Sequence, residues 1–163
     1  RANGFSRCNG GAGERDLLAS TREGSAIRRR HPVLRRRRYA TGALAGDIAW
    51  YTPAGSPMTD SDWSAGWTRS VVAHFDGTRD ADRDDHGQPV LDDDLLIILN
   101  GWWEPLTFTI PSLDTPMVWI RELDTLAGDD GSITTVGGAA EKLATGAQLV
   151  VGPRAVVVLR SLR

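Results

Sequence analysis

The sequence predicts a mostly β fold, an antiparallel β-sandwich preceded by one helix. Three observations support this prediction. After Gly42 the chain consists of short runs of strand-forming residues, each followed by a cluster of turn residues. Few helical stretches separate these runs, which disfavours a parallel sheet with crossover helices. The length of 163 residues and the hydrophobic content of 40% suit one domain with a core of its own.

Two segments precede the predicted sandwich. Residues 1–13 are rich in glycine and polar residues and show no periodicity, so we expect a disordered lead-in. Residues 14–30 have apolar side chains at rough three-to-four spacing, which predicts a helix that Pro32 terminates. Because one helix cannot bury its own apolar face, we expect it to pack on the following domain or on a part of the protein outside this chain.

Seven short segments of the remaining chain, residues 42–163, qualify as strands. Each is rich in aliphatic, β-branched or aromatic residues, and clusters of proline, glycine and aspartate between them favour turns. The predicted strands span residues 47–51, 70–75, 94–100, 106–110, 117–123, 148–151 and 155–160. This alternation indicates antiparallel strands arranged as a sandwich.

The net charge of −2 conceals a strong asymmetry along the chain. Residues 1–40 contain eleven arginines and three acidic residues, so the remainder is strongly acidic. A basic arm of this kind is one signature of nucleic-acid binding, and the arginines at 28–30 and 35–38 form two dense clusters. The clusters lack interleaved aromatic residues for base stacking. We therefore favour a salt-bridged or solvated helix end, with a nucleic-acid binder as the weakest alternative.

Several function classes lack their sequence signatures. Cys8 is the single cysteine, so no disulfide can form within the chain and no cysteine-based zinc site is expected. The longest apolar run, residues 95–99, is too short to span a bilayer, and no signal peptide pattern is present. We expect no membrane partner and a cytoplasmic location. Phosphate-binding glycine motifs and serine nucleophile motifs are absent, and we predict no cofactor.

Acidic residues concentrate in residues 76–94, where a cation site is conceivable. Asp82 and Asp84 match the first two ligand positions of a calcium-binding loop, but His86 and Asp93 depart from its later positions. The flanking sequence also lacks the helices of that motif. We therefore interpret this acidic loop as a solvated hairpin connection and assign no metal site.

Two glutamates, Glu104 and Glu122, are conceivable acids for glycoside hydrolysis. That chemistry requires two carboxyl groups facing one cleft, with one of them kept protonated by its surroundings. Neither glutamate has an identifiable partner at a fixed spacing in the sequence. We assign no catalytic residue.

The six tryptophans are more than average composition would supply, and two of them, Trp102 and Trp103, are adjacent. Tryptophan offers a flat apolar platform for sugar rings and is also a large core residue. In an extended segment adjacent side chains point to opposite faces, so we expect one of the pair to be buried and the other exposed. Trp102 and Trp103 are our candidate substrate-binding residues.

Three segments together carry a resemblance to a known family. They are residues 27–39 (IRRRHPVLRRRRY), 47–67 (DIAWYTPAGSPMTDSDWSAGW) and 92–111 (DDDLLIILNGWWEPLTFTIP). In this order and spacing they resemble the C-terminal part of isoamylase-type glycogen debranching enzymes, which belong to the α-amylase superfamily of glycoside hydrolases. One departure concerns the candidate site, because the family usually has two histidines where this chain has Trp102 and Trp103.

The resemblance implies a (β/α)8 catalytic barrel followed by an α-amylase-type C-terminal β-sandwich. Residues 14–41 would be the last barrel helix and a linker, and residues 42–163 the sandwich domain. The family cleaves α-1,6-glucosidic branch linkages in glycogen with an Asp nucleophile, a Glu acid/base and an Asp stabiliser on the barrel. All three precede the matched segments, so none is assigned to this chain.

These implications favour one function and leave two alternatives. The chain begins with arginine and has its first methionine at position 58, so we expect a fragment of a longer product. We expect this fragment to be inactive alone, with the missing catalytic barrel as its partner. The alternatives are a free-standing module that binds α-glucan through Trp102 and Trp103, and the basic-arm nucleic-acid binder.

Overall fold

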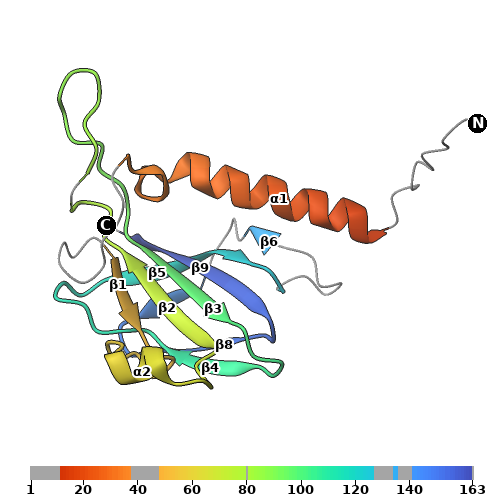
Figure 1. Ribbon diagram of the computed structural model, residues 1–163. Helices are drawn as coiled ribbons and strands as arrows, with labels where there is room; N and C mark the ends of the chain where they lie inside the picture. The colour runs from red at the N-terminus through yellow and green to blue at the C-terminus, as the bar shows by residue number, and fades with distance from the viewer. Residues whose placement is uncertain (1–11, 38–47, 80, 127–133, 136–140, 163) are drawn as a thin grey trace, which may run out of the picture.

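The computed structural model of the protein describes residues 12–37, 48–79, 81–126, 134–135 and 141–162. It confirms the predicted fold class, because the chain is mostly β and every described strand pair is antiparallel (Figure 1). Helix α1 (Ala12–Arg30) and a 3-10 helix, η1 (Pro32–Arg35), precede the strands. A five-residue helix, α2 (Asp60–Ser64), follows the first strand.

The strands form a large sheet and a small one. The large sheet has the order β1-β2-β3-β9-β5-β6, with β7 also paired to β5, and the small sheet contains β4 and β8. The strands are β1 (Ile48–Tyr51), β2 (Ser70–Phe75), β3 (Leu95–Asn100), β4 (Leu106–Thr109), β5 (Val118–Asp124), β6 (Thr134–Thr135), β7 (Lys142–Ala144), β8 (Gln148–Val151) and β9 (Ala155–Leu162).

All seven predicted strands are present, with ends that differ from the expected ones by at most two residues. The sequence patterns do not predict β6 and β7, because these strands have only two and three residues and leave no periodicity to detect. Residues 1–11 of the expected lead-in lie outside the described residues, as do residues 38–41 of the expected linker. Helix α1 begins at Ala12, two residues before the predicted start, and ends before Pro32 as expected.

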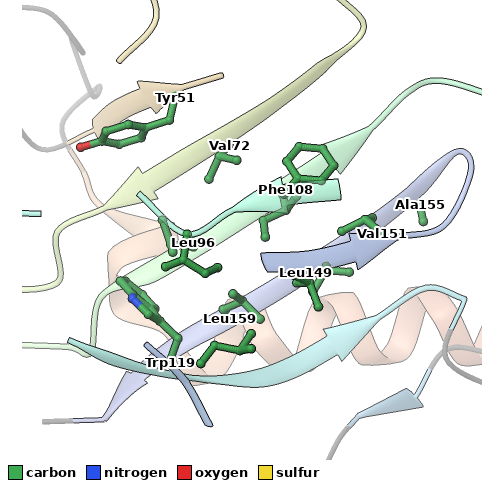
Figure 2. Packing of buried hydrophobic residues seen from close by; sticks show 13 residues of the cluster. Tyr51, Val72, Leu96, Phe108, Trp119, Leu149, Val151, Ala155 and Leu159 are labelled. Carbon is green, nitrogen blue, oxygen red and sulfur yellow. The ribbon is translucent and has the colours of Figure 1, made fainter. Parts of the chain in front are cut away.

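The main hydrophobic core lies between the two sheets (Figure 2). Alternate residues of the central strands point into it, as the burial of Leu96 and Ile98 in β3 illustrates. Its largest members, Trp119 from β5 and Phe108 from β4, are fully buried and come from opposite sheets. The small sheet therefore covers one face of the large sheet and closes the core.

A second, smaller core lies on the other face of the large sheet, beneath the end of α1 and η1. It contains Ile27, Val33, Leu95, Leu123 and Val158. Within residues 21–30, Ile27 is the buried side chain, and the others are exposed or partly buried. The C-terminal turn of α1 thus packs on the sandwich.

Candidate functional site

A cleft of about 380 Å³ opens at the end of the sandwich where β2 begins and β3 ends. Two stretches of chain form its walls, one from β1 to β2 and one from β3 to β4. The lining residues are Thr52, Pro53, Met58, Asp62, Trp67, Thr68, Arg69, Ser70, Trp102 and Leu106. The cleft therefore combines aromatic and aliphatic surface with a few polar groups, which is the usual composition of a ligand site.

The structure places Trp102 in this cleft, but it corrects the expected geometry of the tryptophan pair. The rings of Trp102 and Trp103 stack on one another, with centroids 3.7 Å apart and planes 24° from parallel. Trp102 is partly buried and Trp103 is 60% exposed, so neither is a core residue. The prediction of opposite faces was wrong because residues 101–105 bend away after β3 instead of continuing as a strand.

Asn100, the last residue of β3, fixes the start of this bend. Its side-chain amide is buried and donates to the backbone oxygens of Glu104 (2.9 Å), Val151 (3.2 Å) and Gly152 (2.9 Å). Its side-chain oxygen accepts hydrogen bonds from the Trp102 backbone N–H (3.0 Å) and from the Ser70 hydroxyl (3.0 Å). One side chain therefore connects the Trp102 bend to β2 and to the end of β8.

Replacing Asn100 with alanine is expected to lower the free energy of unfolding by about 1–3 kcal/mol, because it leaves buried backbone groups without partners. The indole N–H NMR signal of Trp102 should also shift as its bend loosens. Chemical denaturation monitored by circular dichroism gives the first quantity. Gln148→Ala is the matched control, since it removes an exposed amide from β8. Equal stabilities of the two variants would contradict the role of Asn100.

Close backbone packing supports the same bend from the other wall of the cleft. The Gly101 N–H donates to the backbone oxygen of Arg69 at 2.9 Å. A side chain at position 101 would place its Cβ only 2.5 Å from that oxygen, so this approach requires glycine. The Arg69 guanidinium carbon lies 5.9 Å from the centroid of the Trp102 ring, within range of a cation–π interaction.

Helix α2 positions the polar wall of the cleft. Thr59 and Asp62 form a capping box, in which the Thr59 N–H donates to Asp62 Oδ2 (2.8 Å) and the Asp62 N–H donates to the Thr59 hydroxyl. The hydrogen bonds from the Thr59 side chain and backbone lower the pKa of Asp62. Asp62 is therefore a carboxylate at neutral pH and faces the cleft together with Trp67, which is 80% exposed.

Neither Asp62 nor Trp67 was predicted from the sequence as a member of a site. The pattern Thr59-x-x-Asp62 is a helix-start signal that could have predicted α2. The pairing of residues 67–70 with the Trp102 bend, however, depends on the antiparallel register of β2 and β3, in which Ser70 lies opposite Asn100. Spacing in the sequence does not reveal this register.

A second polar cluster, which we call the His31 cluster, lies at the junction of α1 and the large sheet. His31 is 2% exposed, and its Nδ1 and Nε2 lie 3.0 Å from Asp92 Oδ1 and 2.9 Å from Glu122 Oε2. Arg30 also binds Glu122, and Arg160 binds Asp93 at 2.8 Å. A neutral imidazole donates from only one nitrogen, so two carboxylate partners favour the doubly protonated ring.

The His31 cluster makes the surroundings of Glu122 unfavourable for a general acid. Burial raises the pKa of Glu122, but the hydrogen bonds and charges of His31 and Arg30 outweigh burial, and the net pKa is lowered. A general acid at neutral pH needs a raised pKa. Glu104, the other conceivable acid, is exposed next to the Trp102 bend.

The acidic loop between β2 and β3 folds back on itself, as predicted for a hairpin connection. Its carboxylates accept hydrogen bonds from the loop backbone, for example Asp84 from the His86 N–H (2.9 Å) and the Gln88 N–H (2.8 Å). Asp82 accepts from the Arg37 N–H at 3.0 Å. Among the described residues, no group of three potential ligands is arranged to hold a metal ion.

Contacts within the chain engage several arginines of the basic clusters. Arg35 donates to the Arg29 backbone oxygen (3.1 Å), and Arg36 donates to the backbone oxygen of Asp76. Arg30 forms an ion pair with Glu122, whereas Arg28 and Arg29 are exposed. Across the part of the chain that the structure describes, no helix is both long and apolar enough to cross a membrane.

Comparison with known proteins connects this fold to one family. A family model described as the C-terminal domain of isoamylase matches residues 47–160. A glycogen operon protein GlgX homolog from Mycobacterium tuberculosis is 36% identical over 116 residues, which are 68% of this chain and 16% of the relative. An isoamylase from Pseudomonas amyloderamosa is 27% identical over 127 residues, which are 78% of this chain and 15% of that protein. The chain thus spans about a sixth of the length of these relatives.

Proposed function

This chain belongs to the isoamylase C-terminal domain family, and on this premise we propose that it forms the C-terminal β-sandwich of a glycogen debranching enzyme. The reaction would be hydrolysis of α-1,6-glucosidic branch linkages. The observation that carries the proposal is the family match itself, because residues 47–160 include the sandwich from β1 almost to the end of β9. A cytoplasmic location stays a prediction.

In this proposal the domain contributes structure, and its partner is a (β/α)8 catalytic barrel. Helix α1 would be the final barrel helix, anchored on the sandwich by Ile27 and the His31 cluster. The proposal accounts for the exposed surface of residues 21–30, since the other faces of this helix would pack on barrel elements.

We propose further that the chain is inactive alone. Retaining hydrolysis requires a nucleophile and an acid about 5–5.5 Å apart. The lowered pKa of Glu122 is unsuited to the acid, and Asp92 is engaged by the same histidine. Measurable release of linear chains from glycogen by the purified chain would contradict this statement.

A chimeric enzyme tests the proposed role. Residues 47–160 would replace the matching segment of the Pseudomonas amyloderamosa isoamylase, which shares 27% identity with this chain. We expect the chimera to keep kcat/KM for glycogen debranching within about tenfold of the parent, a change of about 1.4 kcal/mol. A variant of the relative with the segment deleted is the control. A chimera no more active than the deletion variant would contradict the proposal.

The alternative of a free-standing glucan-binding module makes a different prediction about the native protein. An antibody against residues 42–163 would detect a band far above 17.7 kDa if the sandwich belongs to a complete enzyme. A band near 17.7 kDa would favour the free-standing module.

A further inference from the structure

We propose that the cleft between Trp67 and Trp102 is a binding site for a short stretch of α-1,4-linked glucan chain. The choice of glucan as the ligand rests on the proposed function, whereas the presence of a site rests on the geometry of the cleft. The site differs from the expected pair Trp102 and Trp103, because Trp103 does not line the cleft.

The aromatic surface of the cleft suits a sugar ring. Trp67 is 80% exposed and lines the cleft, so most of its aromatic surface is accessible to a ligand. Trp102 also lines the cleft and is partly buried, with Trp103 stacked on one face of its ring. Tryptophan faces bind apolar C–H surfaces, and each pyranose ring has such surfaces beside its hydroxyl groups.

Two charged groups beside these rings can recognise the hydroxyl groups. The capping box engages Asp62 through Oδ2, so Oδ1 is not used in that cap and can accept a hydrogen bond from a sugar. The Arg69 guanidinium lies over Trp102 and can donate several hydrogen bonds. An apolar platform flanked by a carboxylate and a guanidinium matches a ligand that has apolar faces and polar edges.

The cleft is also held in place before any ligand arrives. Asn100 fixes the Trp102 backbone, Gly101 binds the Arg69 backbone, and Trp103 stacks against Trp102 at 3.7 Å. Trp103 is therefore a positioning residue in this proposal. Preorganised side chains lose little entropy on binding, which favours recognition of a flexible oligosaccharide. The volume of about 380 Å³ is near the lower end of the range for ligand sites, so we infer contact with only a few glucose units.

Titration of the full chain with maltoheptaose tests the site, with the indole N–H signals of the tryptophans followed by NMR. We expect saturable shifts of the Trp67 and Trp102 signals, while the signal of Trp119, buried in the core, stays in place. Trp67→Ala and Trp102→Ala should each raise the dissociation constant about tenfold or more. Circular dichroism spectra like that of the parent would show that both variants are folded.

Trp63→Ala is the matched control, because Trp63 is 51% exposed but packs edge-on against Trp50 at 5.5 Å and does not line the cleft. Its dissociation constant for maltoheptaose should stay within about twofold of the parent value.

Absence of shifts at millimolar maltoheptaose would overturn the site, as would equal weakening of binding by all three variants. Equal binding of a β-1,4-linked glucose oligomer would overturn the assignment to α-glucan. The titration requires no barrel, so a failed chimera together with saturable binding would contradict the proposed function and leave the cleft as a glucan site.

Discussion

Replacing Trp119 with alanine is expected to lower the free energy of unfolding by about 3–5 kcal/mol, the largest effect that we expect for a single core substitution in this chain. Trp119 is fully buried between the sheets (Figure 2). Its ring meets that of His74 edge-on, with centroids 6.2 Å apart. Removal of the indole loses its buried apolar area and leaves a cavity that the neighbouring strands of the sandwich can fill only in part. Urea denaturation at a fixed pH measures the difference.

Trp67→Ala is the matched control for this substitution, because it removes the same side chain from a position that is 80% exposed. Its effect on the free energy of unfolding should be about 0.5 kcal/mol or less.

Trp119→Phe adds a second comparison. The indole N–H of Trp119 is buried with no hydrogen-bond partner among the described residues, so phenylalanine removes a polar group that the core does not satisfy. We expect Trp119→Phe to cost clearly less than Trp119→Ala. A loss below about 1 kcal/mol for Trp119→Ala would contradict the central place of this residue in the core.

The fold was predictable from the sequence because the strand signals are local. The long strands are rich in aliphatic residues, as β3 and β9 show. Glycine, proline and aspartate residues separate one strand from the next. The strands that the patterns do not predict, β6 and β7, depend on pairing with β5 for their existence. Such short strands have no signal of their own, since their backbone is fixed by a neighbour that is distant in the sequence.

The candidate site was predictable only in part, for the same physical reason. Tryptophan content singled out Trp102, but its partners across the cleft come from a segment about 35 residues earlier, brought close by the pairing of β2 with β3. The bend at Trp102 also depends on distant groups, because the Asn100 side chain donates to the backbone oxygens of Val151 and Gly152 at the end of β8. Local rules for an extended chain therefore gave the wrong relative orientation of Trp102 and Trp103.

His31→Ala is expected to lower the free energy of unfolding by about 3–5 kcal/mol at pH 6, because it leaves Asp92 and Glu122 buried without the cation between them. The charged groups that surround His31 in this cluster are Arg30, Asp92, Asp93, Arg121, Glu122 and Arg160. Burial lowers the pKa of His31, but its hydrogen bonds to the two carboxylates outweigh burial and raise the pKa above the ordinary value of 6.5. Folding therefore favours the protonated imidazole.

The direction of these shifts sets a pH window for stability. Since the pKa of His31 is raised in the folded state, its contribution is fully present below pH 6.5 and is lost as the pH rises through the folded-state value. Since the pKa of Glu122 is lowered, its contribution is present above pH 4.5 and is lost as the pH falls through its folded-state value. The contribution of this pair is greatest between these limits, and the melting temperature should fall from pH 6 toward pH 9.

The variant His31→Gln isolates the effect of the His31 charge on the pH dependence of stability. Glutamine can keep one hydrogen bond but carries no charge. The variant should be less stable than the parent at pH 6, and the difference should shrink as the pH rises and the parent loses its imidazolium. His86→Gln, which removes an exposed histidine from the acidic loop, is the control substitution. Parallel profiles for the parent and His31→Gln above pH 6 would mean that folding does not raise the pKa of His31. In that case the junction of α1 with the sandwich would depend on Ile27, Val33 and the arginine ion pairs instead of on a charged histidine.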